Sequence, residues 1–146
     1  MPTYRCTAPE GLLDPPRRAA LASAITRTHS AVTGAASYFA QVLFEEVPHG
    51  HYFVAGAPLR GGQIFVHGHI RAGRSSGDRA RLISELIAAV AAAAGLPRRN
   101  VWVYLAELPA GCMAEYGRVL PEPGGEQAWL DEFSAEDRAF VARGAE

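Results

Sequence analysis

Residues 63–105 read QIFVHGHIRAGRSSGDRARLISELIAAVAAAAGLPRRNVWVYL, and this stretch decides the fold. It begins with IFVHGHI, a β-branched and aromatic run that is typical of a strand. Ser75 and Asp78 then form an S-x-x-D capping box, and apolar residues at helical spacing follow as far as Gly95. A second β-prone run, VWVYL, closes the stretch. The sequence here therefore predicts a strand, a helix and a second strand.

The first half of the chain has the same order. Thr3–Thr7 is β-prone, and Asp14 followed by Pro15 is a helix start with a capping side chain and a proline in the first turn. A helix is expected over Arg17–Val32, and a strand over Tyr38–Glu46. Two β-α-β units in tandem predict an α+β fold in which a four-stranded sheet carries two helices on one face.

Shorter features complete the pattern. Tyr52–Ala55 is a brief extended piece, and Leu108–Pro123 is expected to be a loop or small hairpin. Ser134 and Asp137 open a last short helix, to about residue 142. The 146 residues are expected to form a single domain of residues 1–146, with two halves at about 1–58 and 59–123 and a C-terminal helix.

Charge and hydropathy exclude several kinds of partner. The net charge of -1 provides no polybasic surface, so neither nucleic acid nor an anionic membrane is expected as a partner. No apolar run approaches about 18 residues and no charged leader precedes an apolar segment, which favours a cytoplasmic protein. The two cysteines, Cys6 and Cys112, are too few and too far apart for a disulfide framework, and packing roles are expected for both.

Helices on one face of the sheet leave its other face uncovered. That face carries apolar side chains too and needs a cover. A second subunit is the simplest cover, so oligomerisation is expected on structural grounds.

Pro2 stands directly behind Met1. If Met1 is removed, Pro2 has a free secondary amine, which can act as a proton donor or a base. The reference pKa of such an amine is ~7.7–8.0, and burial or nearby charge can move it either way.

Arg71 and Arg74 lie between a predicted strand and a capped helix. Two guanidinium groups can bind one carboxylate through paired hydrogen bonds, and the helix start adds backbone N–H groups and the positive end of its dipole. The alternative is that both are solvated loop arginines.

Three further side chains could act on a bound acid. His29, on the flank of the first helix's apolar stripe, could hydrogen-bond a carboxylate or help activate water, or could be a packed core histidine. Tyr104 shares a strand face with Trp102 and could be a core aromatic. Glu115, in an apolar stretch, could be a general base or could pair with Arg118.

Two pairs of histidines have strand spacing but do not predict a metal site. The pairs are His49 with His51 and His67 with His69, and each would need a third convergent ligand that nothing in the sequence provides. We expect no metal and no cofactor.

Linked motifs along nearly the whole chain resemble the tautomerase superfamily, and within it the cis-3-chloroacrylic acid dehalogenase family. The motifs are Ala40-Gln41-Val42, Ile64-Phe65-Val66-His67-Gly68, Arg71-Ala72-Gly73-Arg74-Ser75, Val101-Trp102-Val103-Tyr104 and Glu115-Tyr116-Gly117-Arg118. The resemblance implies a homotrimer of the tautomerase fold without a cofactor or metal. The residues on which it places the family's functional positions are Pro2, His29, Arg71, Arg74, Tyr104 and Glu115.

The leading hypothesis is therefore hydration and dehalogenation of a small 2,3-unsaturated carboxylate such as cis-3-haloacrylate, giving malonate semialdehyde. Two alternatives stay open. One is keto–enol tautomerisation of an enolpyruvate with Pro2 as the base, and the other is a non-enzymatic trimeric binding protein. Water activation by Glu115 with Tyr104 separates the first hypothesis from both, because neither alternative needs it.

Overall fold

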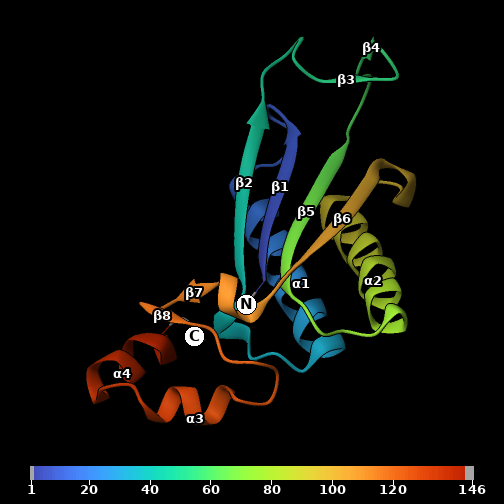
Figure 1. Cartoon of the computed structure of the whole chain (residues 1–146). Helices are drawn as coiled ribbons and strands as arrows, with labels where there is room; N and C mark the ends of the chain where they lie inside the picture. Colours follow the sequence, from blue (N-terminus) through green and yellow to red (C-terminus); the bar gives the residue numbers. More distant parts are fainter. Residues whose placement is uncertain (1, 144–146) are drawn as a thin grey trace.

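The computed structural model describes residues 2–143, and its long elements alternate as strand, helix and strand in each half of the chain (Figure 1). In chain order the elements are β1 (Thr3–Pro9), α1 (Pro15–Thr33), η1 (Ser37–Phe39), β2 (Gln41–Val47), β3 (Phe53–Val54), β4 (Ala57–Pro58), β5 (Ile64–Arg71), α2 (Ser76–Ala94), η2 (Arg98–Asn100), β6 (Val101–Leu108), η3 (Ala110–Cys112), β7 (Ala114–Glu115), β8 (Arg118–Val119), α3 (Glu126–Asp131) and α4 (Ala135–Arg143).

The long strands form a mixed four-stranded sheet in the order β2-β1-β5-β6. The outer pairs, β1 with β2 and β5 with β6, are parallel, whereas β1 and β5 are antiparallel. Thr3 lies opposite both Gln41 and His69, and Arg71 lies opposite Leu108. The starts of β1 and β2 and the ends of β5 and β6 therefore meet at one end of the sheet, which we call the site end. The sheet confirms the predicted α+β architecture.

Both long helices lie where the sequence predicted, and α1 extends two residues before and one residue beyond the expected range of 17–32. Asp14 and Ser75 cap α1 and α2, each side chain accepting a hydrogen bond from the backbone N–H three residues on. Gly34 and Gly95 end the helices in the left-handed region, where glycine is favoured because it has no Cβ. The two helices lie side by side on one face of the sheet (Figure 1).

The main core lies between these helices and the sheet. Its side chains alternate along the strands and recur at helical spacing on α1 and α2, so each element buries one face. Burial of each of these aliphatic side chains contributes about 1.5–3 kcal/mol relative to exposure. The fully buried members include Tyr4, Cys6, Leu21, Ile25, Ile64, Val66, Ile70, Leu82, Leu86 and Val90.

A second, smaller cluster joins the C-terminal helices to the site end of the sheet. This C-terminal cluster consists of Phe39, Leu120, Trp129, Phe133 and Val141. In Figure 1 α3 and α4 lie below the sheet, beside the start of β2 and the hairpin β7–β8. The C-terminal segment is thus packed against the end of the sheet at which β1 begins.

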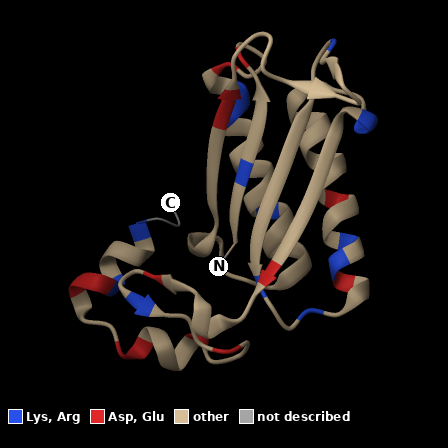
Figure 2. Cartoon of the chain, turned by 45° about the horizontal axis from the view of Figure 1, so that its top comes forward, with Lys and Arg blue, Asp and Glu red and all other residues tan. Residues whose placement is uncertain are grey.

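The other face of the sheet is open in the single chain. Trp102 and Tyr104 point from β6 onto it with 44% and 59% of their surfaces exposed, and Leu43 on β2 is 38% exposed. Most of the strand residues are uncharged in Figure 2, but this face also carries an exposed ion pair between Arg5 on β1 and Glu45 on β2, with Nη1 and Oε1 3.5 Å apart. Because large apolar side chains without a cover are unusual on a monomer, this face has the character of an interface.

Three local expectations differ from the structure. Tyr38 and Phe39 belong to the 3₁₀ turn η1, not to a strand, because both pack against the C-terminal cluster and a strand would send them to opposite faces. The extended piece expected at residues 52–55 is confirmed only at Phe53–Val54, which form the small hairpin β3–β4 with a turn that places Ala55 and Gly56 at positive φ. Helix α3 was not expected at all.

Candidate active site

Arg71 and Arg74 are brought together by a sharp bend at the site end. Arg71 is the last residue of β5, and Gly73 has a φ of 106°, a conformation that strongly favours glycine. Ser75 then caps α2, its Oγ accepting from the N–H of Asp78 at 3.0 Å. Strand end, bend and capped helix start thus follow within five residues, which places both guanidinium groups on the same side of the turn.

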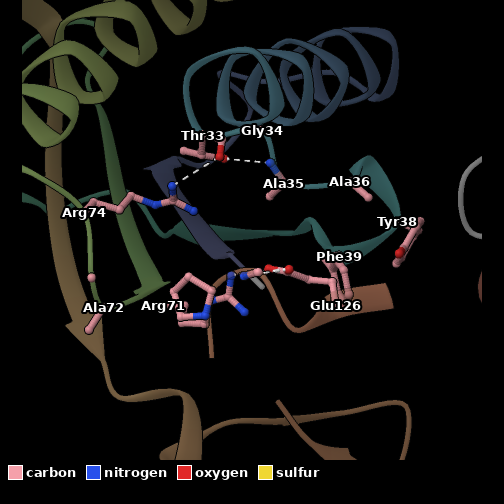
Figure 3. A pocket seen from close by; sticks show the side chains of 13 residues that line it. Thr33, Gly34, Ala35, Ala36, Tyr38, Phe39, Arg71, Ala72, Arg74 and Glu126 are labelled. Carbon is pink, nitrogen blue, oxygen red and sulfur yellow. Dashed lines mark hydrogen bonds and ion pairs between the residues drawn. The ribbon is translucent and has the colours of Figure 1, made fainter. Parts of the chain in front are cut away.

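Both arginines line a pocket of about 380 Å³. Figure 3 shows Arg74 directed toward the end of α1 and Arg71 directed toward the C-terminal segment. Backbone and small side chains form much of the rest of the wall. The lining residues are Thr33, Gly34, Ala35, Ala36, Tyr38, Phe39, Arg71, Ala72, Gly73, Arg74, Pro123, Gly124 and Glu126.

Arg71 is held by the C-terminal segment. Its side chain is only 5% exposed, its Nη1 donates to the carbonyl oxygen of Pro121 at 2.7 Å, and its Nη2 forms an ion pair with Glu126 Oε1 at 2.5 Å. Its Nε has no partner among the described residues. Arg71 is therefore a buried, directed group, unlike a solvated loop arginine.

Arg74 has fewer partners. Its Nη1 donates to the carbonyl oxygen of Thr33 at 3.3 Å, and within residues 2–143 its buried Nε has no partner. Burial and the neighbouring charge of Arg71 both lower the pKa of Arg74. Two like charges at one pocket attract an anion that can lie between them.

His29 lies behind the arginines, inside the core. It is 2% exposed, and its Nδ1 is 2.8 Å from the hydroxyl oxygen of Tyr4. Burial, and next the positive charge of Arg74, lower its pKa to about 3, so His29 is uncharged at neutral pH. Burial also raises the pKa of Tyr4, which keeps its hydroxyl protonated. The structure thus agrees with the interpretation of His29 as a packed core histidine, and the ring lies close enough to Arg74 for that charge to lower its pKa.

Pro2 begins the described chain at the same end of the sheet. It is fully buried, and its carbonyl oxygen accepts a hydrogen bond from the N–H of Gln41 at 2.9 Å. Because Thr3 pairs with His69 and the strands are antiparallel, Pro2 extends β1 toward the end of β5 that carries Arg71. The sheet itself therefore fixes the position of this residue.

Glu115 lies on the hairpin β7–β8, next to a second hollow. Tyr116 and Gly117 form the turn with φ values of 52° and 78°, and the Tyr116 hydroxyl donates to the carbonyl oxygen of Tyr38 at 2.5 Å. Tyr38 and Phe39 line both this hollow and the arginine pocket, so a single 3₁₀ turn separates the two. Arg118 pairs with Glu132, not with Glu115.

Tyr104 is not part of either pocket in the single chain. It lies on the open face, where its ring packs edge-on against Phe65 with centroids 5.0 Å apart. Of the six residues singled out in the sequence, Arg71 and Arg74 line the arginine pocket, whereas Pro2 and His29 are buried near the same end of the sheet and line neither this pocket nor the second hollow. Glu115 lines the second hollow, across the 3₁₀ turn from the arginines, and Tyr104 lies on the open face.

Comparison with known proteins supports the resemblance to the tautomerase superfamily. A family model described as "Putative oxalocrotonate tautomerase enzyme" matches residues 1–133. The crystal structure of N1, described as a member of the cis-3-chloroacrylic acid dehalogenase family, is 34% identical, covers 97% of this chain and 99% of its own, and superposes with a TM-score of 0.93. The chain belongs to the cis-3-chloroacrylic acid dehalogenase family of the tautomerase superfamily.

Other solved structures are similar over shorter stretches of this chain. The structure of native Ps01740 is 31% identical, with a TM-score of 0.72 over 77% of this chain and 99% of its own. A structure described as a fused 4-OT symmetric trimer is 24% identical, with a TM-score of 0.73 over 81% of this chain and 94% of its own, and so shows the fold alone. None of the curated proteins matches the chain.

One charged residue of the arginine pocket, Glu126, was not predicted from the sequence. Glu126 begins α3 directly after Gly124-Gly125, three residues beyond the segment for which a loop or small hairpin was expected. The usable signal was an acidic residue in the first turn of a helix, but the six-residue helix itself was too short to be recognised.

The structure of residues 2–143 also bears on membranes and metals. No described helix is long and apolar enough to cross a membrane. Residues 2–143 contain no group of three or more histidine, cysteine, aspartate or glutamate side chains that could hold a metal ion.

Proposed function

We propose that this protein catalyses the cofactor-independent hydration of a small 2,3-unsaturated carboxylate, such as cis-3-haloacrylate. The observation that carries the proposal is the pocket in which Arg71 and Arg74 face one space at the end of β1 where Pro2 lies. Membership of the dehalogenase family supports the same class of reaction.

In this proposal the arginines bind the substrate carboxylate and draw electron density toward it. Arg74 has N–H groups left after its contact with Thr33, and the buried Nε of Arg71 is unpartnered within the described chain. When Tyr4 donates to Nδ1 of His29, the ring proton is on Nε2, which gives the neutral imidazole a donor for the acid. Withdrawal of electrons through the carboxylate makes C3 of the substrate electrophilic.

Water then attacks C3. Glu115, oriented by Tyr104, takes a proton from the water, and the cationic amine of Pro2 delivers a proton to C2 once Met1 has been removed. The 3-halo-3-hydroxy acid loses halide from C3 and the proton of its hydroxyl, leaving malonate semialdehyde. A paired base and acid with electrostatic stabilisation of the enediolate-like charge accounts for the acceleration.

The active assembly in this proposal is a homotrimer. Tyr104 lies on the open face and outside the pockets of its own chain, so a neighbouring subunit has to supply it. Trp102 and Leu43 give that face the apolar surface that an interface requires. Structures similar to this chain include fused 4-OT trimers, which supports assembly through this fold.

Keto–enol tautomerisation is the second candidate, because the matching family model is described by a tautomerase activity. The two activities are separated by proton NMR of the purified protein incubated with cis-3-chloroacrylate, propiolate or phenylenolpyruvate. Malonate semialdehyde from the first two acids is expected. Turnover of phenylenolpyruvate alone would establish the tautomerase instead.

A further inference from the structure

Glu126 places a negative charge in the arginine pocket. Its Oε1 pairs with Arg71 Nη2 at 2.5 Å, and its Oε2 accepts from the N–H of Gly124 at 2.9 Å. Both residues line the pocket, and 30% of the Glu126 side chain is exposed. Figure 3 shows the carboxylate between Arg71 and the segment of Tyr38 and Phe39.

The carboxylate is ionised at neutral pH. Burial would raise its pKa, but the hydrogen bonds from Arg71 and the backbone outweigh burial and hold the pKa below its ordinary value. The charge of Glu126 in turn contributes, after burial, to the raised pKa of Tyr38, so its field reaches the facing wall.

The charged side chains of the pocket lining are thus two arginines and one glutamate, which together carry a formal net charge of +1. His29, behind them, adds nothing because it is uncharged. A singly charged acid balances this pocket. A doubly charged acid of the same size brings a second negative charge toward Glu126, and this repulsion is not offset by a third cation in the lining.

We propose that Glu126 is a specificity-determining residue, which restricts the arginine pocket to acids with a single negative charge. This inference rests on the proposed function, since it takes the pocket as the site of the substrate carboxylate. The Glu126 carboxylate cannot leave the pocket without breaking its hydrogen bond with the N–H of Gly124. The fold of residues 121–126 therefore holds the negative charge in the pocket.

The test compares two inert acids of similar shape, monomethyl malonate and malonate, at a pH where both are fully ionised. Isothermal titration calorimetry of the full chain should give a dissociation constant about tenfold lower for the monoester, from the repulsion of one partly screened charge. In Glu126→Gln, both acids should bind more tightly because the repelling charge is gone. The gain should be larger for malonate, because it has two negative charges that Glu126 repels and the monoester has one. The preference for the monoester should therefore shrink or reverse.

Glu122→Gln is the matched control. It removes the same charge from the same segment, but Glu122 is exposed and is not among the residues that line the pocket. The ratio of the dissociation constants for malonate and the monoester in Glu122→Gln should equal that of the natural chain. The inference is overturned if the natural chain binds malonate as tightly as the monoester, if it binds neither, or if Glu126→Gln leaves the ratio unchanged. The proposed function is judged separately, by turnover of unsaturated acids, so either idea can fail alone.

Discussion

The Nδ1 of His29 lies 2.8 Å from the hydroxyl oxygen of Tyr4, and both side chains are buried. Tyr4 itself packs across Gly68, where a Cβ would come within 2.5 Å of the tyrosine ring. A glycine on β5 therefore lets a tyrosine on β1 reach a histidine on α1. These contacts position the imidazole behind the arginine pocket, where burial and the charge of Arg74 keep it uncharged.

The uncharged His29 should make the protein sensitive to acid. Its folded pKa, about 3, is below the value of about 6.5 expected in the unfolded chain, so only the unfolded state takes up a proton as pH falls. The free energy of unfolding should decline by at most about 1.4 kcal/mol per pH unit below pH ~6.5. Urea unfolding between pH ~6.5 and ~5.5 measures this slope above the range in which the carboxylates of the unfolded chain gain protons.

Replacing the histidine should flatten that slope. His29→Gln lowers stability overall but removes the buried group that resists protonation, so the pH dependence over this window should nearly vanish. His49→Gln, at an exposed position, is the matched control and should keep the natural slope. An unchanged slope in His29→Gln would show that other groups cause the acid sensitivity.

Pro2→Ala should lower hydration by ~10²-fold or more, because a primary amine differs from a secondary one in basicity and placement. The fold should survive, since alanine keeps the carbonyl group that accepts from Gln41. Pro9→Ala, at the far end of the same strand, is the control. Steady-state turnover is compared after mass spectrometry has verified removal of Met1. Full activity in Pro2→Ala would exclude this residue as the acid.

The two arginines should respond differently to truncation. Arg74→Ala should raise KM by ~10-fold or more and lower kcat, because a charge-assisted hydrogen bond contributes about 1.5–3 kcal/mol. Arg71→Ala should do the same and also release the contacts with Pro121 and Glu126. Hydrogen–deuterium exchange over residues 121–126 should therefore accelerate in Arg71→Ala alone.

The exposed Arg60→Ala serves as the control for loss of charge and should change neither kinetics nor exchange. If exchange is the same in all three variants, Arg71 does not tether the C-terminal segment.

The sequence was sufficient for the main architecture because local signals and burial agree there. Asp14 and Ser75 cap the long helices, Gly34 and Gly95 end them, and alternation on the strands matches the burial of the core. Each of these signals lies within a few residues of the structure that it specifies, so no long-range contact was needed to interpret it.

The missing parts depend on contacts between distant segments. Phe39 turns away from strand geometry because it packs against Trp129, their centroids being 5.7 Å apart. Glu126 becomes a pocket residue only through Arg71, which is 55 positions earlier in the chain. Periodicity carries no information about such pairs. The position of Tyr104 on the open face, away from the arginine pocket, likewise follows from the pairing of β6 with β5. It could not be deduced from the motif Val101-Trp102-Val103-Tyr104 alone.

The open face should be an interface between copies of this chain. Sedimentation should give a mass near three times 15.6 kDa, and Trp102→Glu should dissociate the assembly because it places a charge on that face. Phe140→Glu, at a 61% exposed position on α4, is the matched control and should leave the mass unchanged. A monomer at micromolar concentration would contradict the prediction.

A composite site also predicts complementation. Tyr104→Phe should keep the assembly intact but lower hydration. When it is unfolded and refolded together with Glu115→Gln, mixed assemblies should contain some sites with both natural groups. Partial recovery of hydration is expected in the mixture, and its absence would place Tyr104 and Glu115 outside a shared site.

Glu115→Gln should separate the two candidate reactions. Hydration needs a base for water and an acid for carbon, whereas tautomerisation can use one amine for both transfers. Glutamine keeps the shape of the side chain and removes its basicity, so hydration should fall ~10²–10⁴-fold, the range of a positioned general base. Tautomerisation of phenylenolpyruvate should fall far less, since Pro2, Arg71 and Arg74 are unchanged.

The pH profiles of the two reactions give a second distinction, because the rate of hydration should fall as Pro2 loses its proton and the rate of tautomerisation should fall as Pro2 gains one. Glu132→Gln, on the partner of Arg118, controls for disturbance of the hairpin, and its hydration rate should stay close to that of the natural chain. If Glu115→Gln depresses both activities equally, Glu115 positions the hairpin and does not activate water.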